Sequence, residues 1–131
     1  MSPHLWPVRV YYEDTDLAGI VYHANYLKYI ERARSEMVRA AGIDQAAMRA
    51  AGQVFVVARI EADYLRPAFY DDQLAVETRA ASFRPARFVM RQAVTRDGVA
   101  LFRAEVTVAL TDLRGRPRRL GPEIAALFTE S

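Results

Sequence analysis

The sequence contains no cysteine, which excludes thiolate nucleophiles, disulfide bonds and Cys-X-X-Cys metal sites. Its two histidines, His4 and His23, are too few for a zinc site of the usual ligand type. The six glycines form neither a Gly-X-Gly-X-X-Gly nor a Walker pattern, and no serine lies in a Gly-X-Ser-X-Gly elbow. We therefore expect a protein that uses neither a metal nor a cofactor.

Long hydrophobic runs are also missing. The longest uncharged run, Leu17–Leu27, is far shorter than the roughly 20 residues that span a membrane, and the first ten residues do not resemble a targeting segment. Eighteen basic residues nearly balance sixteen acidic ones, which gives no indication of nucleic-acid or membrane-surface binding. We expect a cytoplasmic protein with no nucleic-acid partner and no integral membrane contact.

What is present is the composition of an ordinary globular chain, with 131 residues of which 52% are hydrophobic and 26% charged. A chain of this length buries about two thirds of the surface that its unfolded form exposes, which is enough for one core. We expect residues 1–131 to form a single domain.

The first part of the chain combines one strand with one long helix. Arg9–Tyr12 is a strand-forming stretch that runs into a polar cluster. Residues 24–41 have the period of an amphipathic helix closed by Gly42, and residues 44–51 predict a second, short helix. The apolar positions expected to face the core are Tyr26, Ile30, Ala33, Met37 and Ala40.

The second part changes to the alternating period of strands. We expect half-buried strands near residues 58–64, 74–79, 88–95 and 100–110, with a hairpin at Asp97-Gly98 and a final helical turn after Gly121-Pro122. Strands that follow one another without helices between them pair antiparallel. The prediction is an α+β fold in which a five-stranded antiparallel sheet wraps the long helix.

The segment from Asp14 to Tyr26 is the best candidate for chemistry. It places a carboxylate, a permissive glycine and a helix start within a dozen residues. Unpaired N–H groups in the first helical turn can polarise a carbonyl oxygen, while a carboxylate a few residues upstream, folded back by a turn at Gly19, could attack that carbonyl or deprotonate a water. Such a site suits an activated acyl group such as a thioester.

Simpler interpretations exist for the same residues. Asp14 and Asp16 could only cap the turn and the helix, and His23 could be an ordinary histidine near a helix start. Lys28 is the only lysine, and the arginine bias is either compositional or a need for forked phosphate-binding donors. Arginines 84, 87, 114, 116, 118 and 119 could simply be solvated.

At these residues the sequence resembles the hotdog-fold acyl-CoA thioesterases of the 4-hydroxybenzoyl-CoA thioesterase-like family, and most closely their Tol-Pal-associated branch. The motif stands here as Arg9-Val10, Thr15-Asp16 and Gly19-Ile20-Val21, followed by Tyr-His-Ala-Asn-Tyr. Looser similarity continues through Asp63-Tyr64-Leu65-Arg66-Pro67-Ala68, Asp71-Asp72 and residues 112–117, so it covers nearly the whole chain.

The resemblance implies a role for individual residues. Asp16 matches the catalytic carboxylate, acting as nucleophile or as general base, and the backbone N–H of His23 matches the group that polarises the thioester carbonyl. Arg84 lies where the family has a basic residue near the CoA nucleotide, with Arg87 as a second candidate. The remaining residues of the active-site turn are Thr15, Gly19, Tyr22 and Asn25.

The function implied is hydrolysis of an acyl-CoA to a free carboxylic acid and CoA. The resemblance also implies a homodimer, often paired further into a tetramer, with each active site between two subunits. The alternatives are a non-catalytic module that binds acyl-CoA or acyl carrier protein and, more distantly, a small basic nucleic-acid binder. Asp16 distinguishes the enzyme from the binding module, because a binding module does not need this carboxylate.

Overall fold

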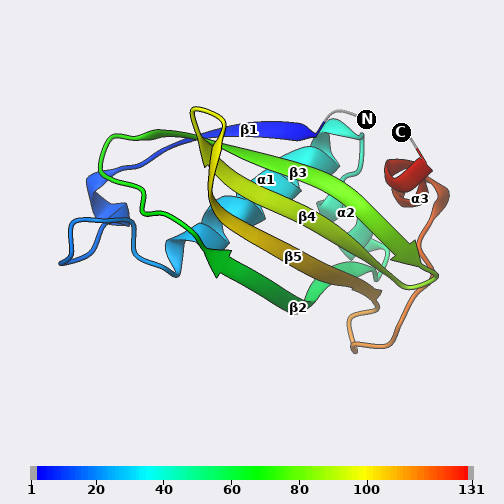
Figure 1. The fold of residues 1–131 in the computed structure, drawn as a ribbon. Coiled ribbons are helices and arrows are strands. Elements are labelled where there is room, and N and C mark those ends of the chain that lie inside the picture. Colours follow the sequence, from blue (N-terminus) through cyan, green and yellow to red (C-terminus); the bar gives the residue numbers. More distant parts are fainter. Residues whose placement is uncertain (1–2, 130–131) are drawn as a thin grey trace.

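A curved antiparallel sheet of five strands forms the body of the protein, in the order β1-β3-β4-β5-β2 (Figure 1). The computed structural model describes residues 3–129. The predicted α+β hotdog arrangement is confirmed. Its elements are β1 (His4–Arg9), η1 (Tyr12–Asp14), α1 (Asn25–Ala40), α2 (Gln45–Ala50), β2 (Val54–Tyr64), β3 (Gln73–Arg84), β4 (Arg87–Arg96), β5 (Val99–Thr111) and α3 (Pro122–Thr129).

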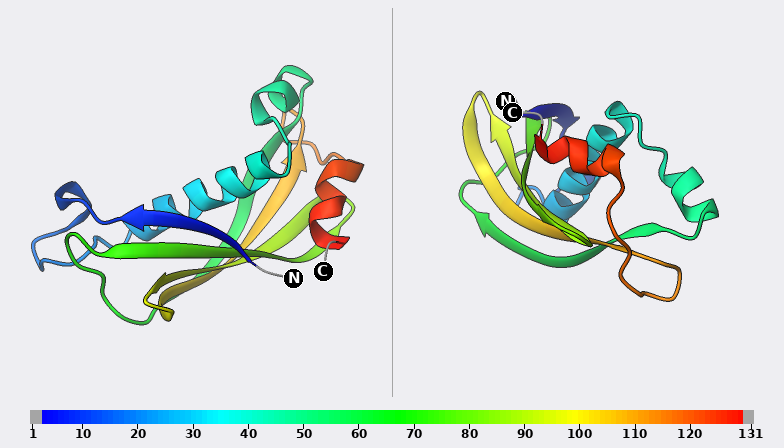
Figure 2. Two further views of the ribbon diagram at one scale, coloured as in Figure 1. Left: turned by 90° about the horizontal axis from the view of Figure 1, so that it is seen from above. Right: turned by 90° about the vertical axis from the view of Figure 1, so that its right-hand side faces the viewer.

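Helix α1 lies inside the curve of the sheet (Figure 2). The predicted inward positions Tyr26, Ile30 and Ala33 are buried, and Met37 packs against the core. Ala40 is exposed, so its predicted burial is wrong, because it belongs to the last turn before the chain leaves at Gly42 (φ +85°). The sheet residues buried opposite the helix include Leu74, Val76, Met90, Val94, Phe102 and Val106.

The first strand lies earlier in the chain than the predicted Arg9–Tyr12. β1 ends at Arg9, and Tyr12–Asp14 forms a 3₁₀ turn instead. The Asp14 carboxylate accepts the Tyr11 N–H at 2.9 Å, which turns the chain out of the sheet. Pro7 is tolerated in β1 because this strand is an edge of the sheet.

The prediction that residues 58–64 are half-buried is also wrong. β2 pairs only with β5, and its residues from Val56 onward are all exposed. The cause is the position of α1, which packs mainly on β1, β3 and β4 and leaves β2 uncovered. Val56, Val57, Ile60 and Tyr64 therefore present an apolar strand to the surface.

The turns between strands define the two ends of the sheet. The predicted hairpin at Asp97 (φ +51°) and Gly98 (φ +81°) is confirmed, with both residues in the left-handed conformation that such a turn requires. It lies at the end of the sheet where β1 finishes and β3 begins. The β3–β4 turn lies at the other end (Figure 1). Within residues 3–129, no helix is long and apolar enough to cross a bilayer.

Candidate active site

Asp16 begins a tight turn that closes a miniature hairpin. Its backbone N–H donates to the Ile20 carbonyl at 2.9 Å, and the Gly19 N–H donates back to the Asp16 carbonyl at 2.9 Å. Gly19 has φ +81°, a left-handed conformation that favours glycine. One carboxylate oxygen of Asp16 accepts the Ala18 N–H at 2.9 Å, and the side chain is exposed. The turn thus presents an accessible carboxylate in a fixed orientation.

The chain then enters α1 through contacts with the Asp14 carbonyl. This oxygen accepts the Tyr22 N–H and the Asn25 side-chain amide, each at 2.9 Å. Thr15 braces the preceding turn, because its hydroxyl donates to the Tyr12 carbonyl at 2.7 Å. These contacts give Thr15 and Asn25 structural roles in the predicted active-site turn. They fix the direction in which the helix begins.

The beginning of α1 carries unpaired donors. Among the described residues, the backbone N–H groups of His23 and Ala24 have no protein acceptor. No side chain caps the helix at Ala24. Free N–H groups at a helix start carry partial positive charge and bind an anion or a polarised oxygen.

Asp16 and His23 line the same hollow, whose volume is about 420 Å³. The structure therefore brings together the carboxylate and the helix start that the sequence predicted. Tyr22 is exposed, and its ring lies 4.5 Å from that of His23 between centroids. The rest of the lining is Ile20, Val21, Tyr26, Tyr64, Leu65, Arg66 and Pro67.

Tyr64, Arg66 and Pro67 were not predicted as site residues from the sequence. Tyr64 is the last residue of β2, and Arg66 and Pro67 belong to the segment that follows it. The family resemblance included this stretch only as a loose similarity. The segment is joined to the helix start, because the Val21 N–H donates to the Ala68 carbonyl at 2.9 Å. The Ala68 N–H in turn donates to the Tyr26 hydroxyl at 3.1 Å. Burial raises the pKa of Tyr26, so this hydroxyl stays protonated at neutral pH.

Helix α1 carries a second buried tyrosine, Tyr29. Tyr29 is almost fully buried, and within residues 3–129 its hydroxyl has no hydrogen-bond partner. Burial, reinforced by the Asp14 carboxylate, raises the pKa of Tyr29. Its hydroxyl is therefore neutral. No group of three His, Asp or Glu side chains in the described part of the chain is arranged to hold a metal ion.

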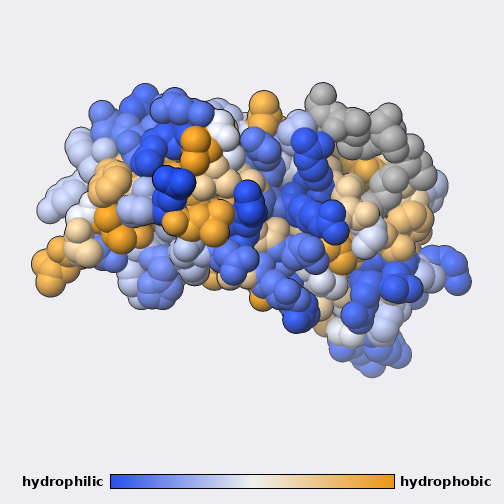
Figure 3. Space-filling model, viewed as in Figure 1, coloured by the Kyte–Doolittle hydropathy of each residue, from blue (hydrophilic) through white to orange (hydrophobic). Residues whose placement is uncertain are grey.

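Hydrophobic surface is present at the end of the molecule that carries the site, on the left in Figure 3. The exposed apolar residues of the site loops include Leu17, Leu65 and Phe69. Leu17 follows Asp16 directly and is fully exposed. An apolar surface of this kind suits an acyl group or a second protein surface.

Arg84 and Arg87 lie at the other end of the sheet. Tyr64, Phe102, Val94 and Val76 form one row across the sheet beside the site. Arg84 lies eight residues beyond Val76 on β3, which corresponds to about 25 Å of strand. Within one chain, the two candidate CoA-binding arginines therefore lie far from Asp16, at the opposite end of the sheet.

Known proteins are similar to this chain over almost its whole length. The acyl-CoA thioester hydrolase YbgC of Escherichia coli O6:H1 is 42% identical over 127 residues, which cover 95% of each chain. The acyl-CoA thioesterase YbgC of Haemophilus influenzae is 41% identical over 94% of this chain and 92% of its own. A probable thioesterase from Bartonella henselae has a crystal structure with a TM-score of 0.86 and 39% identity, covering 92% of this chain and all of that one.

The family comparison covers almost the same extent of the chain. The family model of the thioesterase-like superfamily matches residues 10–128, which include the Asp16 turn, α1 and all of β2 to β5. The resemblance found in the sequence is confirmed at this level. The chain belongs to the thioesterase-like superfamily.

Proposed function

We propose that this protein hydrolyses acyl-CoA thioesters to a free carboxylic acid and CoA. The observation that carries the proposal is that the exposed carboxylate of Asp16 and the open start of α1 at His23 line one hollow. The names of the YbgC relatives, acyl-CoA thioester hydrolase and acyl-CoA thioesterase, support the same reaction.

The two groups have complementary roles in the proposed reaction. The His23 N–H donates to the thioester carbonyl oxygen and stabilises the negative charge that develops there. The Asp16 carboxylate either attacks the carbonyl carbon or takes a proton from the attacking water. Attack by Asp16 releases CoA as its thiolate and forms a mixed anhydride, which water then cleaves to the free acid and the restored carboxylate. In the general-base route water adds directly to the thioester carbonyl, and CoA again leaves as its thiolate. The His23 imidazole is exposed beside the hollow and is the second catalytic candidate.

A homodimer formed through β2 completes the proposed assembly. β2 is an edge strand with unpaired backbone groups and exposed Val56, Val57 and Ile60. Edges of this kind are normally paired or covered. Two copies of β2 related by a twofold axis pair antiparallel, which joins the two sheets into one.

This dimer explains how Arg84 and Arg87 can serve a distant site. Arg87 shares a row of the sheet with Ala109 and with Val56, near the beginning of β2, whereas Tyr64 ends the same strand beside the hollow. Antiparallel pairing places the beginning of one β2 next to the end of the other. The proposed CoA contacts are therefore made by arginines of the second copy.

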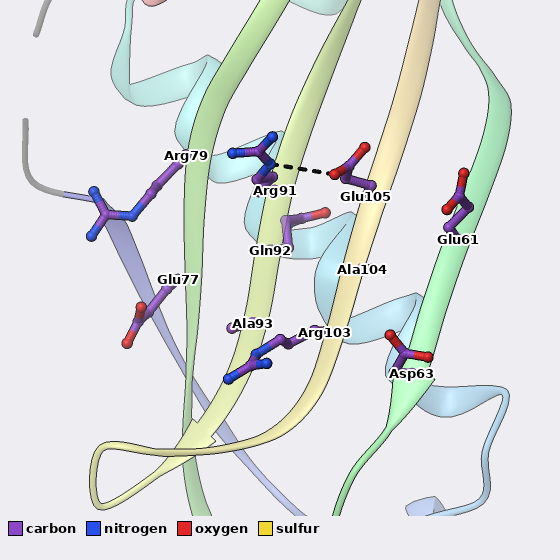
Figure 4. Close-up of a pocket in the computed structure, with 10 residues that line it drawn as sticks. All are labelled: Glu61, Asp63, Glu77, Arg79, Arg91, Gln92, Ala93, Arg103, Ala104 and Glu105. Carbon is purple, nitrogen blue, oxygen red and sulfur yellow. Dashed lines mark hydrogen bonds and ion pairs between the residues drawn. The ribbon is translucent and has the colours of Figure 1, made fainter.

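The open face of the sheet, away from α1, is where we propose that two dimers meet as a tetramer. A hollow of about 400 Å³ on this face is crossed by a row of charges, Glu61, Glu105, Arg91 and Arg79 (Figure 4). The acidic half lies on β2 and β5, and the basic half on β4 and β3. A twofold axis parallel to the strands sets each acidic half against the partner's basic half.

We further propose that the protein acts in the cytoplasm and that nucleic acids are not its partners. A thioester on an acyl carrier protein is the alternative substrate, since it presents the same reacting carbonyl. The opposing proposal, a non-catalytic module for either thioester, predicts binding without turnover.

The test is a hydrolysis screen with short, long and aromatic acyl-CoAs that measures CoA release, with light scattering on the same samples. We expect turnover of at least one acyl-CoA class by a dimer or tetramer. Saturable binding without CoA release would favour the non-catalytic module. An active protein that stays monomeric at micromolar concentration would contradict the shared site. DNA binding with a steep salt dependence would favour the alternative that the protein is a small basic nucleic-acid binder.

A further inference from the structure

Tyr64 joins the end of β2 to the peptide that precedes α1. Its hydroxyl donates to the His23 carbonyl oxygen at 2.8 Å. Its ring packs edge-to-face on two buried aromatic residues, with centroids 5.0 Å from Phe102 and 5.6 Å from Tyr26. The hydroxyl is therefore carried by a ring that the core holds in place.

This contact satisfies a carbonyl that lies just outside the helix. His23 precedes Ala24, the N-cap of α1, so its carbonyl is not one of the acceptors of the regular helical ladder. Here the Leu27 N–H donates to the Ala24 carbonyl at 3.2 Å, so the first turn is tightened. The Tyr64 hydroxyl supplies the donor for His23. The orientation of the residue that carries the free N–H is thus set by a side chain of the sheet.

We infer that Tyr64 is a positioning residue for thioester hydrolysis, an inference that rests on the proposed function. By holding the His23 carbonyl, it fixes the plane of the His23–Ala24 peptide, which carries the free Ala24 N–H, and through the His23 Cα it restrains the neighbouring peptide that carries the His23 N–H. A donor of this kind stabilises the transition state only when it is aimed before the reaction begins. Displacements of about 1 Å at such groups can cost up to a hundredfold in rate.

The experiment compares Tyr64→Phe with Tyr70→Phe. The first substitution keeps the ring that lines the hollow and removes only the hydroxyl. Tyr70 is an exposed tyrosine that does not line the hollow, so it is a matched control. We expect Tyr64→Phe to lower kcat about tenfold, with KM within twofold of wild type and an unchanged shape of the pH profile. Tyr70→Phe should match wild type in all three measurements.

A second measurement follows the His23 peptide without substrate. In Tyr64→Phe, we expect the backbone amide signals of His23 and Ala24 to shift in the ¹H–¹⁵N spectrum, while those of β4 stay unchanged. Tyr70→Phe should leave these amides as they are.

The outcomes distinguish the two proposals. If wild type releases CoA and Asp16→Asn does not, but Tyr64→Phe has wild-type kcat, the positioning role is overturned and the proposed function stands. A higher KM with unchanged kcat would make Tyr64 a substrate contact, and a lost basic limb of the pH profile would make it a proton donor; either result overturns the inference. A wild-type protein that hydrolyses no acyl-CoA overturns both.

Discussion

Arg96 on β4 donates to the carboxylate of Asp72 at 2.6 Å, and the same guanidinium donates to the Pro67 carbonyl at 3.3 Å. The Asp72 carboxylate also accepts the Phe69 N–H at 2.8 Å. The ion pair therefore ties the sheet to the segment that holds Val21 and Tyr26 through Ala68. Pro67, which accepts from Arg96, lines the hollow that contains Asp16 and His23, although neither charged residue lines it.

We predict that Arg96→Ala lowers the free energy of unfolding by about 1 to 2 kcal/mol, because hydrogen bonds to charged groups are lost from a pair that is only 29% and 23% exposed. Catalytic rate should fall with it, since the segment loosens. Arg39→Ala is the control, because its ion pair with Glu36 lies on the surface of α1. Chemical denaturation measures both variants. Equal effects of the two substitutions would contradict the proposed attachment.

Asp16→Asn should lose most of the hydrolytic activity while the protein stays folded. The substitution keeps the size and the oxygen that accepts the Ala18 N–H, but removes the base or nucleophile. Removing a positioned acid-base group costs about a hundredfold to ten-thousandfold in rate. Asp44→Asn, at the N-cap of α2, makes the same chemical change remote from the hollow and should alter nothing. Near wild-type turnover by Asp16→Asn would show that its carboxylate only caps the turn.

The fold could be predicted because the hydrophobic periodicity, the turn residues and the succession of strands along the chain all indicated the same arrangement of one long helix and an antiparallel sheet. The helix was placed to within a residue, and Asp97-Gly98 gave the hairpin. The exposure of β2 could not be predicted, since alternation at Ile60 and Tyr64 reports which residues share a face and not whether another element covers that face.

The candidate site could be predicted only where its residues are close in sequence. Asp16 and His23 are seven residues apart in one motif, and they line one hollow. Tyr64 lies 41 residues from His23, and its hydrogen bond depends on where the end of β2 lies relative to the start of α1. No local pattern contains that information.

Arg84→Ala should raise the KM for acyl-CoA about tenfold and leave kcat nearly unchanged. Forked guanidinium groups hold phosphates well, and a contact that is equal in substrate and transition state affects binding alone. A truncated thioester without the nucleotide should be hydrolysed equally by variant and wild type. Arg49→Ala, an exposed arginine on α2, is the control. An unchanged KM with full-length acyl-CoA would mean that Arg84 is simply solvated.

Asp112 should make stability depend on acid pH. Its carboxylate accepts the N–H groups of Arg114 and Arg116 at 2.8 and 3.0 Å and the Arg116 guanidinium at 2.8 Å. The Arg116 N–H contributes most, and together these donors lower the pKa of Asp112 to about 2, from an ordinary value of 3.8. A folded-state pKa below the unfolded one gives stability that is complete above the unfolded pKa and is lost as pH falls through the folded one.

Asp112→Asn should therefore unfold at a lower temperature than wild type at pH 5 to 7, because the amide cannot reproduce the charge that these donors stabilise. The difference in Tm should shrink as the pH is lowered from 4 to 2, where the wild-type carboxylate takes up its proton. Thermal unfolding followed by circular dichroism at several pH values measures it. A Tm difference that stays constant down to pH 2 would mean that the loop after β5 depends on the shape of this side chain and not on its charge.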